Sequence, residues 1–134
     1  MIDIRVLVRG EIDTPPFVRV LQYPDKEEES IFFNSVAAIK KKIKKSLKIN
    51  ANETLAIFCA YVIEQMRDRK SQDEIENAAH DIVSSDQVLF GVPETLREMS
   101  FDVIVDDFPE QRIKLFEPMK ISNYMMILTN YEQC

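Results

Sequence analysis

Alternating apolar and polar residues predict that the chain begins with two β-strands. Between residues 2 and 9 every even position is apolar, and three of the four odd positions carry a charge. This period of two is typical of a strand with one buried face. A second strand is predicted over 17–22, because it is rich in β-branched and aromatic residues and has prolines before and after it.

The period changes to that of a helix in the middle of the chain. Residues 25–47 carry an apolar stripe at helical spacing, and residues 71–82 carry a shorter one. Residues 51–69 are apolar almost all round, which predicts a central helix covered on several sides. Asn50 and Glu53 have the spacing of a capping box at the start of this central helix. We therefore expect three helices.

Two short helical segments are predicted next, over 86–90 and 94–99. Gly91 is expected to end the first of them, because glycine is the usual residue just beyond a helix and Pro93 follows closely.

The remaining pattern again has a period of two. Strands over 101–107 and 113–115 flank a turn and predict a β-hairpin, and a last strand is predicted over 121–129. We therefore expect an α+β fold, with a three-helix core and an antiparallel β-hairpin, extended by extra N- and C-terminal strands.

The charge balance argues against a nucleic-acid partner. The 134 residues carry a formal net charge of −6, which repels phosphates at long range. Six lysines lie within residues 40–48, but without the arginine and aromatic residues that commonly accompany them in phosphate-binding surfaces. The helix dipole favours cations at that end of the helix 25–47, so a solvated face is predicted. A nucleic-acid binder remains the weaker alternative.

The cysteines and the apolar runs predict a cytoplasmic protein without a membrane segment. Cys59 and Cys134 have neither disulfide-framework nor metal-site spacing, which suits a reducing compartment. The longest apolar run, 55–63, is far shorter than the roughly 18 residues of a membrane span. Charges at the N-terminus occupy the place of a signal peptide's apolar stretch.

No catalytic or metal-binding site is expected in this chain. His80 is the only histidine, whereas a metal site needs three or four converging ligands. Cys59 falls on the helix predicted to be buried, where a thiol is inert. The neighbouring carboxylates Asp106 and Asp107 would point to opposite faces of a strand.

Several short motifs resemble those of the urease gamma subunit family. Residues 47–50 read Leu-Lys-Ile-Asn, against Leu-Lys-Leu-Asn in the family, and Arg67-Asp68 falls where the family has Arg-Asp. The most specific block is 86–94, in which Asp-Gln-Val is followed by Gly-Val-Pro-Glu. The resemblance covers about 30–118. The residues that it marks as structural or interface positions are Asn50, Glu53, Arg67, Asp68, Asp86, Gln87, Val88, Gly91, Val92, Pro93 and Glu94.

The resemblance implies a role in assembly. In that family the gamma subunit carries neither catalytic residues nor metal, and urea is hydrolysed at two nickel ions in the alpha subunit. This chain is then expected to be a non-catalytic subunit, without a cofactor of its own, that packs against urease alpha- and beta-type subunits in an oligomer. Arg67 is expected to bond the last free carbonyls of its helix.

Some positions depart from the family pattern and leave an alternative open. Asp81 takes the place of the family histidine, which leaves His80 one position early, and Arg69 replaces a glycine. The alternative is an orphan interaction module, without urease activity, that self-associates through its terminal strands. The predicted organisation is a single domain over 1–134, with an N-terminal strand extension (1–24), a family core (25–118) and a C-terminal extension (119–134).

Overall fold

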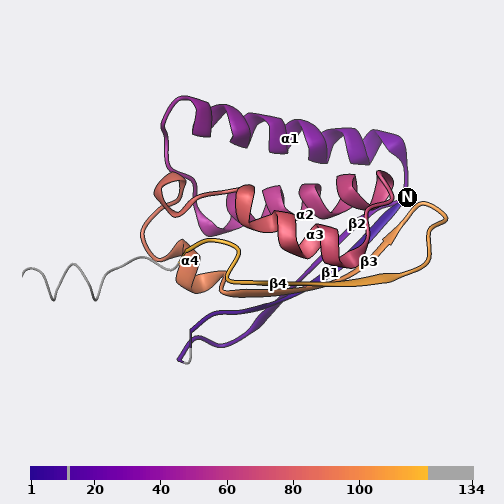
Figure 1. Cartoon of the computed structure of the whole chain (residues 1–134). Coiled ribbons are helices and arrows are strands. Elements are labelled where there is room, and N and C mark those ends of the chain that lie inside the picture. The colour runs from indigo at the N-terminus through magenta and orange to yellow at the C-terminus, as the bar shows by residue number, and fades with distance from the viewer. Residues whose placement is uncertain (12, 121–134) are drawn as a thin grey trace, which may run out of the picture.

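The chain folds into two layers, a four-stranded antiparallel sheet with helices on one face (Figure 1). The computed structural model describes residues 1–11 and 13–120, so the strand predicted over 121–129 and Cys134 lie outside the described residues. The α+β fold class is confirmed. The elements are β1 (Ile2–Arg9), β2 (Phe17–Tyr23), α1 (Lys26–Lys44), α2 (Ala51–Arg67), α3 (Gln72–Ala78), the 3₁₀ helices η1 (Ala79–Asp81) and η2 (Ser85–Gln87), α4 (Val92–Thr95), β3 (Glu98–Val105) and β4 (Gln111–Phe116).

The strands are ordered β2-β1-β3-β4, and every neighbouring pair is antiparallel. The predicted hairpin is confirmed as β3 and β4. The first strand lies in the middle of the sheet, where Ile4 is opposite Leu21 of β2 on one side and Val103 of β3 on the other. β1 is therefore an internal strand, and β2 forms the edge on its side of the sheet.

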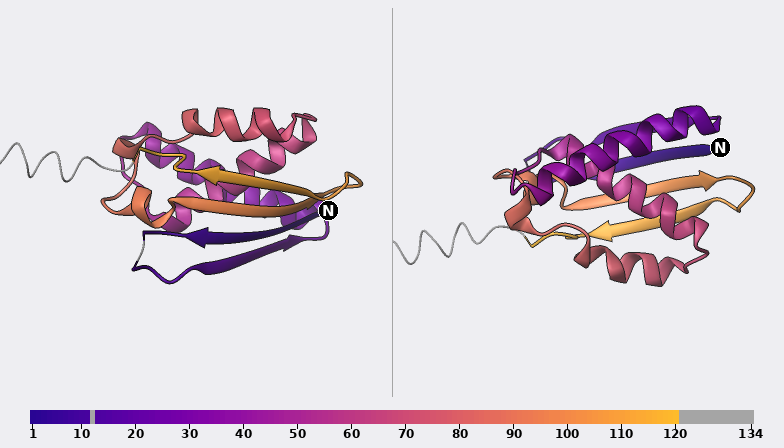
Figure 2. Two further views of the ribbon diagram at one scale, coloured as in Figure 1. Left: turned by 60° about the horizontal axis from the view of Figure 1, so that its bottom comes forward. Right: turned by 90° about the horizontal axis from the view of Figure 1, so that it is seen from above.

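The core lies between the sheet and the helices. The even-numbered side chains of β1 are at most 1% exposed and face the helical layer. α2 crosses this layer next to α1, and α3 lies on the β4 side (Figure 2). Because the sheet and its neighbouring helices cover α2, Phe58 and Val62 are fully buried inside this one chain.

The predicted starts of the three core helices are confirmed. The Glu28 amide donates to the Asp25 carboxylate at 2.9 Å at the start of α1. Asn50 and Glu53 form a reciprocal capping box at the start of α2, with distances of 2.8 and 3.1 Å. α3 begins with an equivalent box on Ser71. These contacts satisfy amides that have no partner within their helices.

The helix predicted over 86–90 is wrong in extent. Only η2 forms there, because Val88 leaves the helical path and makes a parallel bridge with Ile49. This contact joins segments that are far apart in the sequence, so the local pattern does not predict it.

The role expected for Gly91 and the helix predicted over 94–99 also need correction. Gly91 does not end a helix; it precedes α4, with a φ of 89°. Pro93 lies in the first turn of α4, where its fixed φ suits a helix start. α4 ends at Thr95, and β3 begins at Glu98 because that segment pairs with β1.

Changing Lys40, Lys41, Lys44 and Lys45 together to Gln is expected to lower the free energy of unfolding by about 1 kcal/mol at most. All four side chains are exposed at the end of α1, and dipole interactions of this kind are screened by solvent. Urea denaturation measures the change, with the quadruple Arg variant as the charge-preserving control. A loss several times larger would place this face in an essential contact.

Candidate functional site

Most of the family-motif residues lie where two segments meet beside the start of α2, whereas Arg67 and Asp68 lie at its other end. The Ile49 amide donates to the Gln87 carbonyl at 3.2 Å, and the Leu89 amide donates to the Ile49 carbonyl at 2.9 Å. These bonds hold the segment before α2 against the motif segment 84–94. The local geometry is therefore fixed by main-chain contacts.

Side chains within the motif complete the turn. The Ser84 amide donates to Gln87 Oε1 at 3.0 Å, as in a capping box. A hydrogen bond with the Ser84 side chain lowers the pKa of the Asp86 carboxyl below its usual value. Gly91 is needed for its positive φ rather than for space, since no atom lies within 4 Å of the position that a Cβ would take.

The motif also divides into buried anchors and exposed apolar residues. Val88, Val92 and Pro93 are buried against the core. Between these anchors, Leu89 is 48% exposed and Phe90 is 79% exposed. A third large apolar side chain, 54% exposed, lies on the joined segment before α2. We refer to Leu47, Leu89 and Phe90 as the motif patch.

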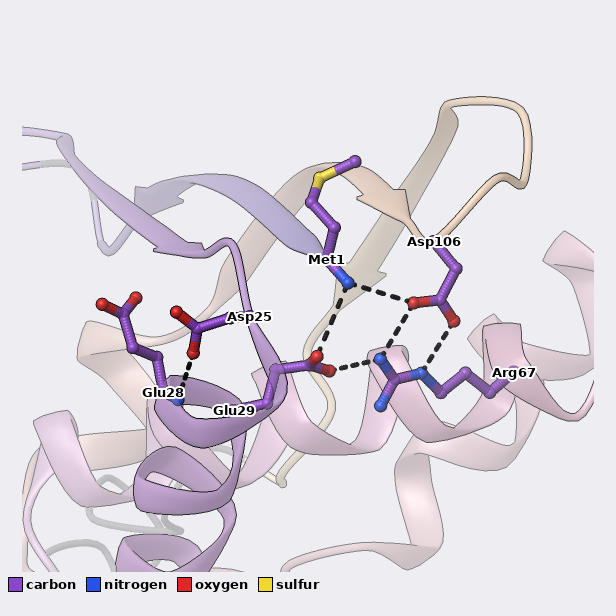
Figure 3. A network of polar contacts seen from close by, with 6 residues as sticks. All are labelled: Met1, Asp25, Glu28, Glu29, Arg67 and Asp106. Atoms are coloured by element: carbon purple, nitrogen blue, oxygen red, sulfur yellow. Dashed lines mark hydrogen bonds and ion pairs between the residues drawn. The ribbon is translucent and has the colours of Figure 1, made fainter.

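Arg67 links three elements of the fold through carboxylates (Figure 3). Its Nε lies 3.1 Å from Asp106 Oδ2, and its Nη2 lies 3.2 Å from Oδ1 and also pairs with Glu29. The Met1 amine lies 3.2 Å from Asp106 and 3.5 Å from Glu29. The expectation that Arg67 would bond the carbonyls at the end of α2 is therefore wrong, because two carboxylates lie within reach. Asp68 is the C-cap residue of α2.

The charges in this ion-pair cluster stabilise one another. Burial by itself would lower the pKa of Arg67, but hydrogen bonds to Asp106 and Glu29 raise it. The Arg67 hydrogen bond is the main cause that lowers the pKa of Asp106. The Glu29 side chain is only 8% exposed, and its carboxylate lies beside the cationic groups of Arg67 and Met1. The cluster joins the start of α1, the end of α2 and the end of β3.

Sequence reasoning missed Glu29 and Asp106 as partners of Arg67. A signal for Glu29 was present, since it shares the buried stripe of α1 with Phe32 and Val36. Asp106 gave no such signal, because it follows β3 in a turn and has a φ of 53°.

The structure does not bring the candidate catalytic or metal-binding residues His80 and Cys59 together in one site. His80 is exposed on η1, and Cys59 is 1% exposed in α2. Burial raises the pKa of the Cys59 thiol to about 12, which keeps it protonated and unreactive. Over residues 1–11 and 13–120, no group of three or more His, Cys, Asp or Glu is placed to hold a metal ion. Within the same ranges no helix is both long and apolar enough to span a bilayer.

Comparison with known proteins identifies the family. The family model described as "Urease, gamma subunit" matches residues 21–112. The urease subunit gamma of Halalkalibacterium halodurans is 31% identical over 84 residues, which cover 63% of this chain and 84% of the relative. Two counterparts from Prochlorococcus marinus, strains AS9601 and MIT 9301, are each 26% identical over the same length. The chain belongs to the urease gamma subunit family.

Proposed function

We propose that this chain is a non-catalytic assembly subunit that packs against a urease alpha-type chain. Family membership over residues 21–112 carries the proposal. The chain has a single histidine, which is exposed, and its one described cysteine is buried and protonated. These donors do not suit nickel, so the metal and the hydrolysis of urea are assigned to the partner.

The motif patch is proposed as the surface that contacts this partner. Its exposed side chains belong to segments whose backbone is fixed by the buried Val88 and Val92 and by the main-chain hydrogen bonds of Ile49. An aromatic side chain presented in this way loses little conformational entropy on binding, and such residues are frequent among binding hot spots. Phe90, at 79% exposed, is the best candidate for the central contact.

The assembly is proposed to include beta-type subunits and to operate in the cytoplasm. A reducing compartment is compatible with the free thiol of Cys59. The acidic balance of the chain supports protein partners rather than nucleic acid.

Replacing Phe90 with Asp is expected to weaken binding to a co-expressed urease alpha-type chain by at least about tenfold. Loss of an interface hot spot is worth roughly 2 kcal/mol or more, which corresponds to more than a tenfold change in affinity. Affinity co-purification and interferometry with the purified partner measure the change. Phe116→Asp is the matched control, because Phe116 is 52% exposed on β4 and is expected to leave binding intact.

Two outcomes would contradict the proposal. Separate monomers of the unaltered chain and its partner at micromolar concentration would remove the assembly role. Equal binding by the Phe90 and Phe116 variants would place the contact outside the motif patch.

A further inference from the structure

The two edges of the sheet are built differently. α3 lies beside β4 (Figure 2), and its Glu76 Oε2 accepts a hydrogen bond from the Lys114 amide at 2.8 Å. This contact occupies a main-chain donor that would otherwise face solvent. No described residue makes such a contact with the edge formed by β2. Proteins usually protect an exposed edge, because it is a template for another strand.

The pairing shows which β2 residues face outward. The Asp106 amide bonds the Met1 carbonyl at 2.8 Å, so odd-numbered residues of β1 direct their main-chain groups to β3. The even-numbered residues of β1 therefore bond β2, and the register places odd-numbered β2 residues opposite them. It follows that Val18, Val20 and Gln22 direct their N–H and C=O groups away from the sheet.

The side chains along this edge offer no protection against pairing. Val18 and Val20 are 48% and 50% exposed, and Arg19 is the only charged residue of β2. No proline interrupts the strand. Beside it runs a groove of about 410 Å³ between β2 and the helices, with Leu21 on one wall and the 65% exposed Ile31 of α1 on the other.

We propose that β2 pairs with β2 of a second copy of this chain, antiparallel and centred on Val20. The two sheets then form one eight-stranded sheet, four strands from each copy. Three outward residues per copy supply three donors and three acceptors, which give about six main-chain hydrogen bonds. In this register Val20 faces Val20 of the second copy, Val18 faces Gln22, Arg19 faces Leu21 and Phe17 faces Tyr23.

The side-chain pattern of β2 is compatible with a second copy as the occupant. An antiparallel pairing centred on Val20 places the half-exposed Val20 side chains opposite each other and Arg19 opposite the apolar Leu21, so the two Arg19 side chains are diagonal neighbours rather than a directly opposed pair. The same pairing places Leu21 of the second copy on the groove side of the sheet, opposite Arg19, which lines the groove. Most of β2 precedes the family match at residue 21, and neither β2 nor the groove includes a residue of the motif patch.

Cysteine cross-linking tests the register. In a Cys134→Ser background, Val20→Cys is expected to give a disulfide-linked dimer under mild oxidation, because the Cα atoms of such a pair lie about 5.5 Å apart. Val18→Cys is the matched control with nearly equal exposure. Its Cα atoms would lie roughly 14 Å apart across the two-fold axis, beyond disulfide range. Preferential cross-linking of Val18→Cys would overturn the proposal.

Analytical ultracentrifugation of the full chain tests whether the β2 edge mediates dimerisation. The unaltered chain is expected to dimerise, and Val20→Pro to weaken the dimer at least tenfold, because proline removes an outward donor that the chain's own sheet does not use. Val20→Lys gives a second test by opposing two like charges. Arg112→Pro, on the outward side of β4, should leave the dimer unchanged within twofold. A monomer at 200 μM, or a dimer indifferent to both Val20 variants, would overturn the proposal.

Discussion

Replacing Arg67 with alanine is expected to lower the free energy of unfolding by about 3 kcal/mol. The change leaves the Glu29 carboxylate, 8% exposed, with only the Met1 amine at 3.5 Å as a cationic partner, and poorly compensated buried charges are destabilising. The expected loss lies at the low end of the range for buried pairs, because the Arg67 and Asp106 side chains are 33% and 42% exposed. Urea denaturation followed by circular dichroism measures the loss.

Arg112→Ala is the matched control for this prediction. Arg112 also pairs with a carboxylate, Asp102, at 2.9 Å, but its side chain is 80% exposed. Its removal should leave the urea midpoint almost unchanged. Adding Glu29→Gln to Arg67→Ala should recover part of the loss, because the buried charge that has lost its guanidinium partner is then gone. Equal midpoints for Arg67→Ala and Arg112→Ala would show that the cluster contributes nothing beyond a surface pair.

The same ion-pair cluster should make the free energy of unfolding depend on pH in the acidic range. Folding lowers the pKa of Asp106 below its ordinary value of 3.8, mainly through its hydrogen bond with Arg67. The associated stability is therefore fully present above that ordinary value and is lost as the pH falls through the lowered folded value. Arg67→Ala should reduce this acid-dependent part, which denaturation series between about pH 5 and pH 2 can measure.

Replacing Phe58 with alanine is expected to lower the free energy of unfolding by about 4 kcal/mol. Phe58 is fully buried at the centre of α2, and removal of its ring takes apolar contacts from the core and leaves a cavity. Leu47→Ala, at a position 54% exposed, should change stability by less than about 0.5 kcal/mol. A similar small change for both variants would mean that the core collapses around the missing ring.

The helices could be predicted because their signals are local. The capping residues Asp25, Asn50 and Ser71 act within a few positions of the helix starts, so their spacing is visible in the sequence. The alternation of β1 likewise predicted its strand and its buried face. Neither pattern predicted which strands pair, because that depends on contacts between distant residues.

The apolar sequence of α2 predicted that the helix is buried, but not which elements bury it. The sequence predicted a central helix covered on several sides. The structure covers Leu55, Phe58 and Val62 with the sheet and helices of the same chain. The prediction of a central helix is therefore confirmed within this one chain, and the proposed partner contact rests on the exposed motif patch instead.

The candidate site was predictable in part. The motif block 86–94 was identified, but its conformation depends on the Ile49 bridge, which is not local. The role of Arg67 was missed for a similar reason. Glu29 and Asp106 are brought to it by the packing of α1 and the turn after β3, and neither arrangement follows from the spacing of charges along the chain.

The central position of β1 has a consequence for how the chain folds. Its neighbour β2 follows within a short loop, but its other neighbour is β3, so that Ile2 lies opposite Val105. During synthesis, the β1–β2 hairpin and the first helices must wait until most of the chain has left the ribosome before the sheet can close. Pairing over such a sequence separation slows folding and leaves an apolar strand edge exposed to other chains in the meantime. We therefore expect nascent chains of this protein to fold more efficiently when a chaperone shields β1 until β3 is available for pairing.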